Sequence, residues 1–171
     1  YIRDITDYGK GENLNPSHTR VDRYIVRAEH DLAWIHDCDK GTNLKLGAET
    51  VYYNARVDGY GGDRKTETRL DLYALLRHQF SARLSSSLNL RQAWVTGYNP
   101  PFTPSAGLEY ILVKNPKDRL TLPVSLARSY RVPTLNERYW EVLGNPDIQP
   151  ETGFNKETGL VWQHKFTAIT Q

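Results

Sequence analysis

Apolar and polar side chains alternate along most of this chain with a repeat of two residues, which is typical of β-strands. In one such segment Tyr24 and Trp34 fall on the apolar face and Arg27 falls on the other. Helical periodicity is almost absent. The expected strands cover residues 1–7, 20–35, 42–57, 66–79, 83–96, 105–113, 119–130 and 154–166. The pattern therefore predicts an all-β fold, an antiparallel up-and-down meander of about eight strands.

The connections between these strands alternate in length. Long polar loops follow the odd segments, and short turns follow the even ones. The long loops cover residues 8–19, 58–65, 97–104 and 131–153. Outer-membrane barrels have this alternation, and their strands are also longer than the five or six residues usual in soluble sheets. We therefore expect a partial segment of a large transmembrane β-barrel.

The spacing of aromatic side chains agrees with a membrane. Tyr24 and Trp34 share the apolar face of one expected strand. At roughly 3.3 Å per residue and a tilt near 40°, they lie about 25 Å apart along the membrane normal, which is the height of a lipid-facing band. Phe80 stands at the short-turn end of its strand. The placement of these aromatics therefore agrees with strands that cross a membrane.

Prolines limit regular pairing at two places. The loop 97–104 contains three prolines, so we expect it to remain unpaired. Pro123 lies on the polar face of its strand and removes one ladder donor. This loss argues against a fully paired strand at that position.

Composition narrows the function classes. The 171 residues include 22 basic and 20 acidic side chains spread along the chain, without the basic stripe that nucleic-acid binding requires. Cys38 is the only cysteine, which excludes an internal disulfide framework. The chain has no methionine, and we expect it to be an internal segment of a longer protein.

The sequence offers no active site. The five histidines are dispersed, and no nucleophile elbow, phosphate-binding glycine loop or paired-cysteine cluster is present. Carboxylates that we expect to face each other, such as Glu29 and Glu49, are typical of solvated strand charges. We therefore predict no catalytic residue, metal or cofactor, and a protein that is not an enzyme.

The outward loops carry the side chains best suited to ligand capture. Exposed aromatics and arginines on loops above a rigid scaffold supply contact area and hydrogen-bond donors at modest entropic cost. The candidate ligand-binding residues are Tyr60, Tyr98, Phe102, Arg131, Tyr139 and Trp140.

The segment after the seventh strand carries a family resemblance. Residues 128–137 read RSYRVPTLNE, residues 144–151 read GNPDIQPE, and a strand rich in Glu and Gly follows at 157–160. This order resembles a motif of TonB-dependent receptors of the bacterial outer membrane. The motif positions are Arg131, Pro133, Thr134, Asn136, Glu137, Gly144, Asn145, Pro146, Asp147, Pro150 and Glu151.

The resemblance implies a large barrel, of about 22 strands in such transporters, that is plugged by a separate N-terminal domain. It imports scarce bulky ligands such as ferric siderophores or cobalamin with energy delivered by TonB. Residues 1–171 would be part of that barrel, with the plug and the remaining strands absent. The implied partners are outer-membrane lipid, a small-molecule ligand such as a metal chelate, and the TonB complex through parts outside this chain.

We expect the motif to brace its loop rather than to contact ligand. Asn145, Pro146 and Asp147 form a turn sequence. Glu137 or Glu151 can pair with Arg131 or Arg138. Two other functions stay open at this point: a passive porin or structural barrel, and a soluble β-sandwich binding module.

Overall fold

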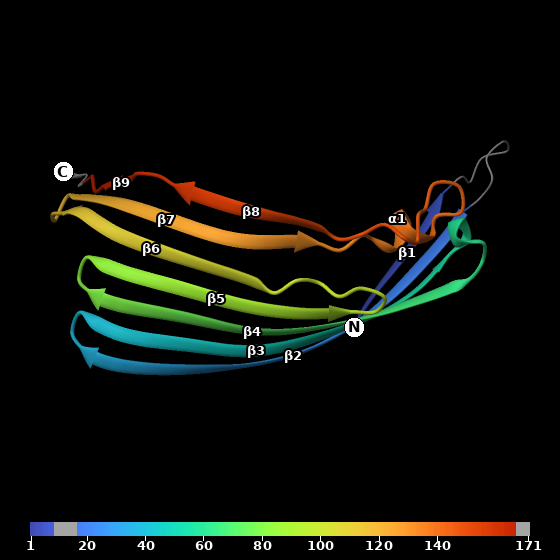
Figure 1. Cartoon of the computed structure of the whole chain (residues 1–171), viewed down its shortest axis with the longest axis horizontal. Helices are drawn as coiled ribbons and strands as arrows, with labels where there is room; N and C mark the ends of the chain where they lie inside the picture. The colour runs from blue at the N-terminus through green and yellow to red at the C-terminus, as the bar shows by residue number, and fades with distance from the viewer. Residues whose placement is uncertain (9–16, 167–171) are drawn as a thin grey trace, which may run out of the picture.

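The computed structural model describes residues 1–8 and 17–166. These residues form one antiparallel sheet in which β1 to β8 lie side by side in chain order (Figure 1). Consecutive strands from β1 to β8 are therefore neighbours in the sheet, and the expected up-and-down meander is confirmed. The last strand, β9, pairs with β7 as β8 does. The described strands make a single curved layer, unlike the two packed sheets of a β-sandwich.

Most of the strands are longer than the sequence pattern predicted. β2 has 21 residues, and β3 and β4 have 18 each. The strand bounds are β1 Ile2–Tyr8, β2 Ser17–Asp37, β3 Lys40–Val57, β4 Arg64–Ser81, β5 Leu84–Val95, β6 Thr103–Lys114, β7 Asp118–Arg131, β8 Glu151–Thr158 and β9 Val161–His164. The short turns all lie at one end of the sheet, and the longer connections at the other (Figure 1). The expected alternation is confirmed for the connections that the structure describes, whereas most of the first expected loop, residues 8–19, lies outside the described residues.

One proline lies inside a strand, where we expected no pairing. Pro104 belongs to β6 and stands opposite Leu90 of β5. The prediction for residues 97–104 is therefore wrong for Thr103 and Pro104. Proline is tolerated here because it is only the second residue of the strand, and pairing with β7 starts at Ser105.

The expected eighth strand is split in two, opposite Pro123. The Gly159 N–H donates to the Pro123 carbonyl at 3.3 Å, but Pro123 has no N–H to return. Pairing resumes beyond this point without a change of register, because Thr158 pairs with Val124 and Val161 with Thr121. The single lost donor thus divides one strand into β8 and β9.

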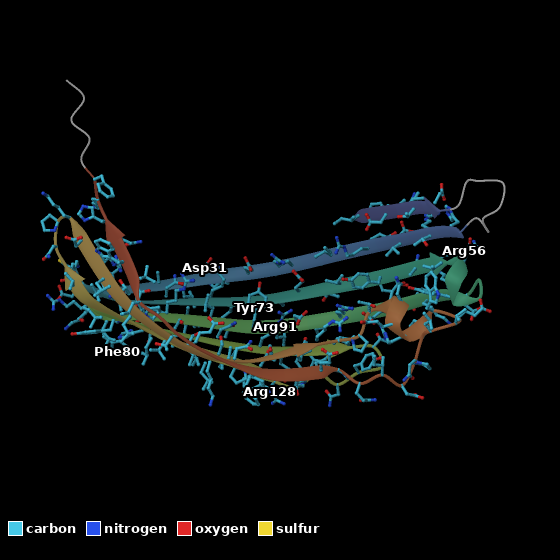
Figure 2. The ribbon with its side chains drawn as sticks, turned by 90° about the horizontal axis from the view of Figure 1, so that it is seen from above. Asp31, Arg56, Tyr73, Phe80, Arg91 and Arg128 are labelled. Carbon is cyan, nitrogen blue, oxygen red and sulfur yellow. The ribbon has the colours of Figure 1, made fainter. Side chains whose placement is uncertain are left out.

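One face of the sheet is apolar and uncovered, and we call it the apolar face. Val26 is 72% exposed, Trp34 46% and Leu126 49%. Their strands are long enough to cross a bilayer, so exposure of these side chains is what contact with lipid requires. Phe80 lies near the short-turn end, far from Arg56 at the opposite end (Figure 2).

The other face, which we call the polar face, carries a network of charge pairs across strands. Arg27 pairs with Glu49, and Arg91 Nε lies 2.9 Å from Asp71 Oδ1. Glu49 therefore faces Arg27, and the expected pairing of Glu49 with Glu29 is wrong. The strands bring opposite charges together, which stabilises this register relative to a slipped one.

No helix in the described residues is long and apolar enough to cross a membrane. The short helices η1 (Asp58–Tyr60) and α1 (Leu135–Tyr139) both lie at the end of the sheet away from the short turns (Figure 1).

Tyr73 lies across Gly47 on the polar face. A Cβ on Gly47 would be 2.2 Å from the Cζ atom of Tyr73, so only glycine leaves room for the ring. The Tyr73 hydroxyl donates a hydrogen bond to Glu29. The ring thus covers the glycine and links β4 to β2.

We expect Gly47→Ala to destabilise the barrel by about 1–3 kcal/mol, because the new methyl group displaces Tyr73 and breaks its bond to Glu29. Gly159→Ala is the matched control, since nothing lies within 4 Å of its Cβ position, and its effect should stay within about 0.5 kcal/mol. Denaturant unfolding of the intact protein in detergent measures the stability of both variants. An equal loss of unfolding free energy in the two variants would contradict this role of Gly47.

Candidate functional site

The connection between β7 and β8 is the longest in the described chain, and we call residues 132–150 the strap. Its helix α1 starts at a capping box: Thr134 Oγ1 accepts the Glu137 N–H at 3.2 Å, and Glu137 Oε2 accepts the Thr134 N–H at 2.7 Å. We did not predict this helix. The Thr-x-x-Glu spacing at 134–137 was the signal that could have revealed it.

Ion pairs hold the base of the strap. Arg131, at the end of β7, pairs with Glu137 of α1 and lies 3.5 Å from Glu151 at the start of β8. The expected pairing of Arg131 with these two carboxylates is confirmed. One guanidinium thus ties both ends of the connection to its helix.

The Gly-Asn-Pro-Asp turn closes against the end of α1. The Gly144 N–H donates to the Trp140 carbonyl at 2.6 Å, and a Cβ on Gly144 would be 2.5 Å from the same backbone. Asn145 N–H donates to the Glu137 carbonyl at 2.9 Å. Asn145 Oδ1 in turn accepts the Asp147 N–H at 3.0 Å. These contacts are internal to the strap, as bracing requires.

A buried charge pair fixes the strap to the sheet. Arg138 of α1 pairs with Glu67 of β4, and their side chains are only 3% and 1% exposed. Arg69 Nε lies 2.6 Å from the other oxygen of Glu67. The alternative in which Arg138 pairs with Glu137 or Glu151 is therefore wrong. No pattern in the sequence points to Glu67 as its partner, because folding alone brings these distant residues together.

Aromatic rings surround this charge pair. The Arg138 guanidinium lies 4.9 Å from the centre of the Tyr98 ring and 5.2 Å from that of Tyr139. Burial raises the pKa of the Tyr98 phenol, and nearby Tyr139 and Asp147 raise it further. Among the described residues the Tyr98 hydroxyl has no hydrogen-bond partner.

The loop between β3 and β4 also contacts the strap. The Glu141 N–H donates to the Gly59 carbonyl at 2.8 Å, and the Trp140 ring covers Gly59 so closely that a Cβ there would be 2.9 Å away. The Tyr60 hydroxyl donates to Asn136 Oδ1. Burial raises the pKa of the Tyr60 phenol, whereas the Arg138 charge lowers it. The strap therefore packs on a second loop as well as on β4.

Four of the six candidate ligand residues meet in this assembly, namely Tyr60, Tyr98, Tyr139 and Trp140. Arg131 lies at the base of the strap. Phe102 lies apart, in a shallow hollow of the apolar face with Leu72 and Leu90. Their role toward a ligand stays a prediction for all six.

Two further side chains stand beside Trp140 at the tip of the strap. Val142 is 82% exposed and Leu143 84%, while Trp140 is 39% exposed. Apolar side chains that remain exposed on a well-anchored loop are typical of a contact surface. We did not single out this Val-Leu pair, although its place in a polar loop was visible in the sequence.

Below the strap, the polar face contains a cavity of about 530 Å³. Arg69, Arg91 and Arg131 contribute to its lining. The cavity opens on the same side of the sheet as the charge pairs described above. It combines cationic and hydroxyl groups beneath the aromatic assembly.

Comparison with known proteins gives these features a family. Residues 3–170 match the family model for the β-barrel of TonB-dependent receptor-like proteins. The chain belongs to the TonB-dependent receptor family. It is part of the β-barrel of a protein of the bacterial outer membrane, and this family consists of receptors and transporters rather than enzymes.

Two relatives agree with this membership. The chain is 24% identical over 140 residues to the vitamin B12 transporter BtuB of Vibrio vulnificus, covering 80% of this chain and 22% of that protein. It shares its fold with the siderophore receptor PirA from Pseudomonas aeruginosa, with a TM-score of 0.76 and 18% identity. That match covers 95% of this chain and 31% of PirA. The chain thus spans less than a third of either relative.

Family membership orients the sheet. In outer-membrane barrels the apolar face contacts lipid, the short turns face the periplasm and the longer loops face outward. The strap, η1 and Tyr98 therefore lie at the outward end, and the polar face lines the lumen. Residues 1–8 and 17–166 contain no group of three or more His, Cys, Asp or Glu side chains placed to hold a metal ion.

We expect Glu67→Gln to release the strap, because Arg138 then remains buried without a carboxylate, at a cost of about 3–5 kcal/mol. Chymotrypsin should cut the strap of the intact receptor about a hundredfold to a few thousandfold faster, since each 1.4 kcal/mol is tenfold. Glu109→Gln is the control: its pair with Arg119 is exposed, and its loss costs about 1 kcal/mol or less. An unchanged cleavage rate in Glu67→Gln would show that the Arg138–Glu67 pair does not hold the strap in place.

The capping box also predicts a pH dependence. The hydrogen bond from the Thr134 N–H and the bond from Arg131 hold the pKa of Glu137 below its ordinary value of 4.5. Ionised Glu137 therefore stabilises the strap above that pH, and the stabilisation is lost as the pH falls through the lowered pKa. We expect pepsin to cut the wild-type strap progressively faster below pH 4.5, whereas Glu137→Gln should be cut readily across that range. Parallel pH profiles would contradict the assignment.

Proposed function

We propose that this chain is part of an outer-membrane active transporter that binds a scarce, bulky ligand at its outward loops and imports it with TonB-derived energy. The observation that carries the proposal is the strap, because it is held rigidly to the lumen wall while Trp140, Val142 and Leu143 stay exposed. A rigid loop with exposed apolar anchors loses little entropy when a ligand binds.

The cavity below the strap favours a ligand with many oxygen atoms or a negative charge. Four arginines contribute to its lining, namely Arg69, Arg91, Arg128 and Arg131. Arg69, Arg91 and Arg131 each pair with a carboxylate of the chain, but a guanidinium has five N–H donors and can bind a ligand oxygen as well. Metal chelates such as ferric siderophores have this chemistry. A large corrinoid such as cobalamin would depend more on the apolar tip. Between the two, the arginines favour a chelate.

Membership of the receptor family favours active transport over a passive porin or a structural barrel. In this proposal the plug domain and the segment that contacts TonB belong to parts of the parent outside this chain. Tyr60 and Tyr98 serve mainly to support Trp140 and Tyr139, since Tyr60 is only 6% exposed. In this proposal the strap tip and the cavity make the contacts with the ligand.

The test replaces the strap tip in the intact receptor. Trp140→Ala combined with Val142→Ser and Leu143→Ser should weaken binding of the cognate chelate or corrinoid at least about tenfold, because three apolar anchors are lost. Glu141→Gln, in the same stretch, should bind as the wild type does. Heat-modifiable gel migration checks that each barrel has folded.

Growth of a deletion strain on candidate iron and cobalamin sources identifies the ligand. Loss of TonB should abolish uptake and leave binding unchanged. Uptake that persists without TonB would indicate a passive barrel, and full binding by the triple variant would exclude the strap tip as a contact.

A further inference from the structure

Three arginines stand side by side on the apolar face at the outward end. Arg20 of β2 pairs in register with Arg56 of β3, and Arg56 pairs with Arg64 of β4. Cβ atoms of residues directly opposite on adjacent strands lie about 4.5–5.5 Å apart, so like charges in such positions repel. A row of three arginines is therefore costly unless an anion lies against it.

A fourth arginine stands beside this row on the first strand. Arg3 of β1 contacts Asp22 at 2.6 Å, and Arg20 contacts the other oxygen of Asp22 at 3.1 Å. Asp22 is buried and also accepts the Tyr1 hydroxyl, so its charge is shared by the first two strands.

Arg56 and Arg64 are less compensated. Both are exposed, and the partner of Arg64 Nε is the neutral amide oxygen of Asn54. Within the described ranges, no carboxylate forms an ion pair with either guanidinium. The neighbouring Asp58 is engaged elsewhere, since it accepts the His18 backbone N–H at 2.7 Å. Arg56 lies at the extreme outward end of the sheet (Figure 2).

The row lies just above the lipid-facing band. Tyr24 and Tyr52 pair in register on the same face, and the row begins four residues further outward on both strands. At roughly 3.3 Å per residue and a tilt near 40°, the difference in height is about 10 Å. Interfacial tyrosines mark the edge of the hydrocarbon, so the row is at the level of the lipid head groups.

We propose that Arg20, Arg56 and Arg64 form a binding site for a phosphate-bearing lipid head group of the outer leaflet. The planar donors of arginine match phosphate oxygens in a paired geometry, and three of them in line can bind more than one phosphate. The uncovered apolar face directly below receives the acyl chains of the same molecule. The site is separate from the lumen and from the strap, so it does not depend on the proposed transport ligand.

The probe is bisphosphorylated lipid A, titrated into the intact receptor in detergent. Arg56→Gln with Arg64→Gln should lower its affinity about tenfold, through loss of charge-assisted hydrogen bonds. Arg83→Gln with Lys117→Gln makes the same change of charge at the short-turn end and should leave the affinity unchanged. Lipid A without phosphates should bind the wild type as weakly as bisphosphorylated lipid A binds the Arg56/Arg64 variant.

Equal affinity of the wild type and the Arg56/Arg64 variant for bisphosphorylated lipid A would overturn the site. Equal binding of the dephosphorylated lipid would also overturn it, because acyl chains alone would then explain the contact. Inorganic phosphate that binds the wild type as tightly as bisphosphorylated lipid A does would assign the row to a soluble anion instead of a lipid. Transport of the cognate ligand by the variant separates this test from that of the proposed function.

Discussion

Inside a bilayer no water is available to backbone amides, so each must find its partner in the neighbouring strand. The continuous ladder from β1 to β8 meets this constraint, and the rest of the structure depends on it. Since the side-chain repeat is two residues, the same ladder separates a lipid-facing surface from a lumenal one. Pro123 shows how strict the requirement is, because one missing donor is enough to divide the last strand.

The outward end is built differently, since the backbone there leaves the ladder. Its order comes from side chains: Arg131 joins the two ends of the strap, and Arg138 inserts beside Glu67 under a cover of tyrosines. A buried ion pair is a modest source of net stability but is very intolerant of losing one partner. This arrangement therefore specifies one position for the strap and leaves its apolar tip free for contact.

The alternation of side chains between the two faces of the sheet also determines which residues lie on the apolar face at the outward end. Even-numbered positions of β2 remain on the outer face beyond the hydrocarbon, where an apolar residue has no advantage. Moving outward along that face of β2, Tyr24 is followed by Asp22 and then by Arg20. The register of the sheet places Arg56 and Arg64 beside Arg20. A charged row in contact with the lipid surface thus arises from the same pleat that produces the apolar band.

The sequence by itself determined the strands, their alternation with long and short connections, and the family motif, because these depend on local periodicity and turn residues. It also contained the capping box of Thr134 and Glu137, which we did not predict. It indicated Arg131 as one of two arginines able to pair with Glu137 or Glu151. Only the tertiary structure decided that Glu67 is the partner of Arg138, that Phe102 lies on the apolar face, and that three arginines stand in line. These outcomes depend on the register between strands, which places residues far apart in the chain side by side and leaves no local trace in the sequence.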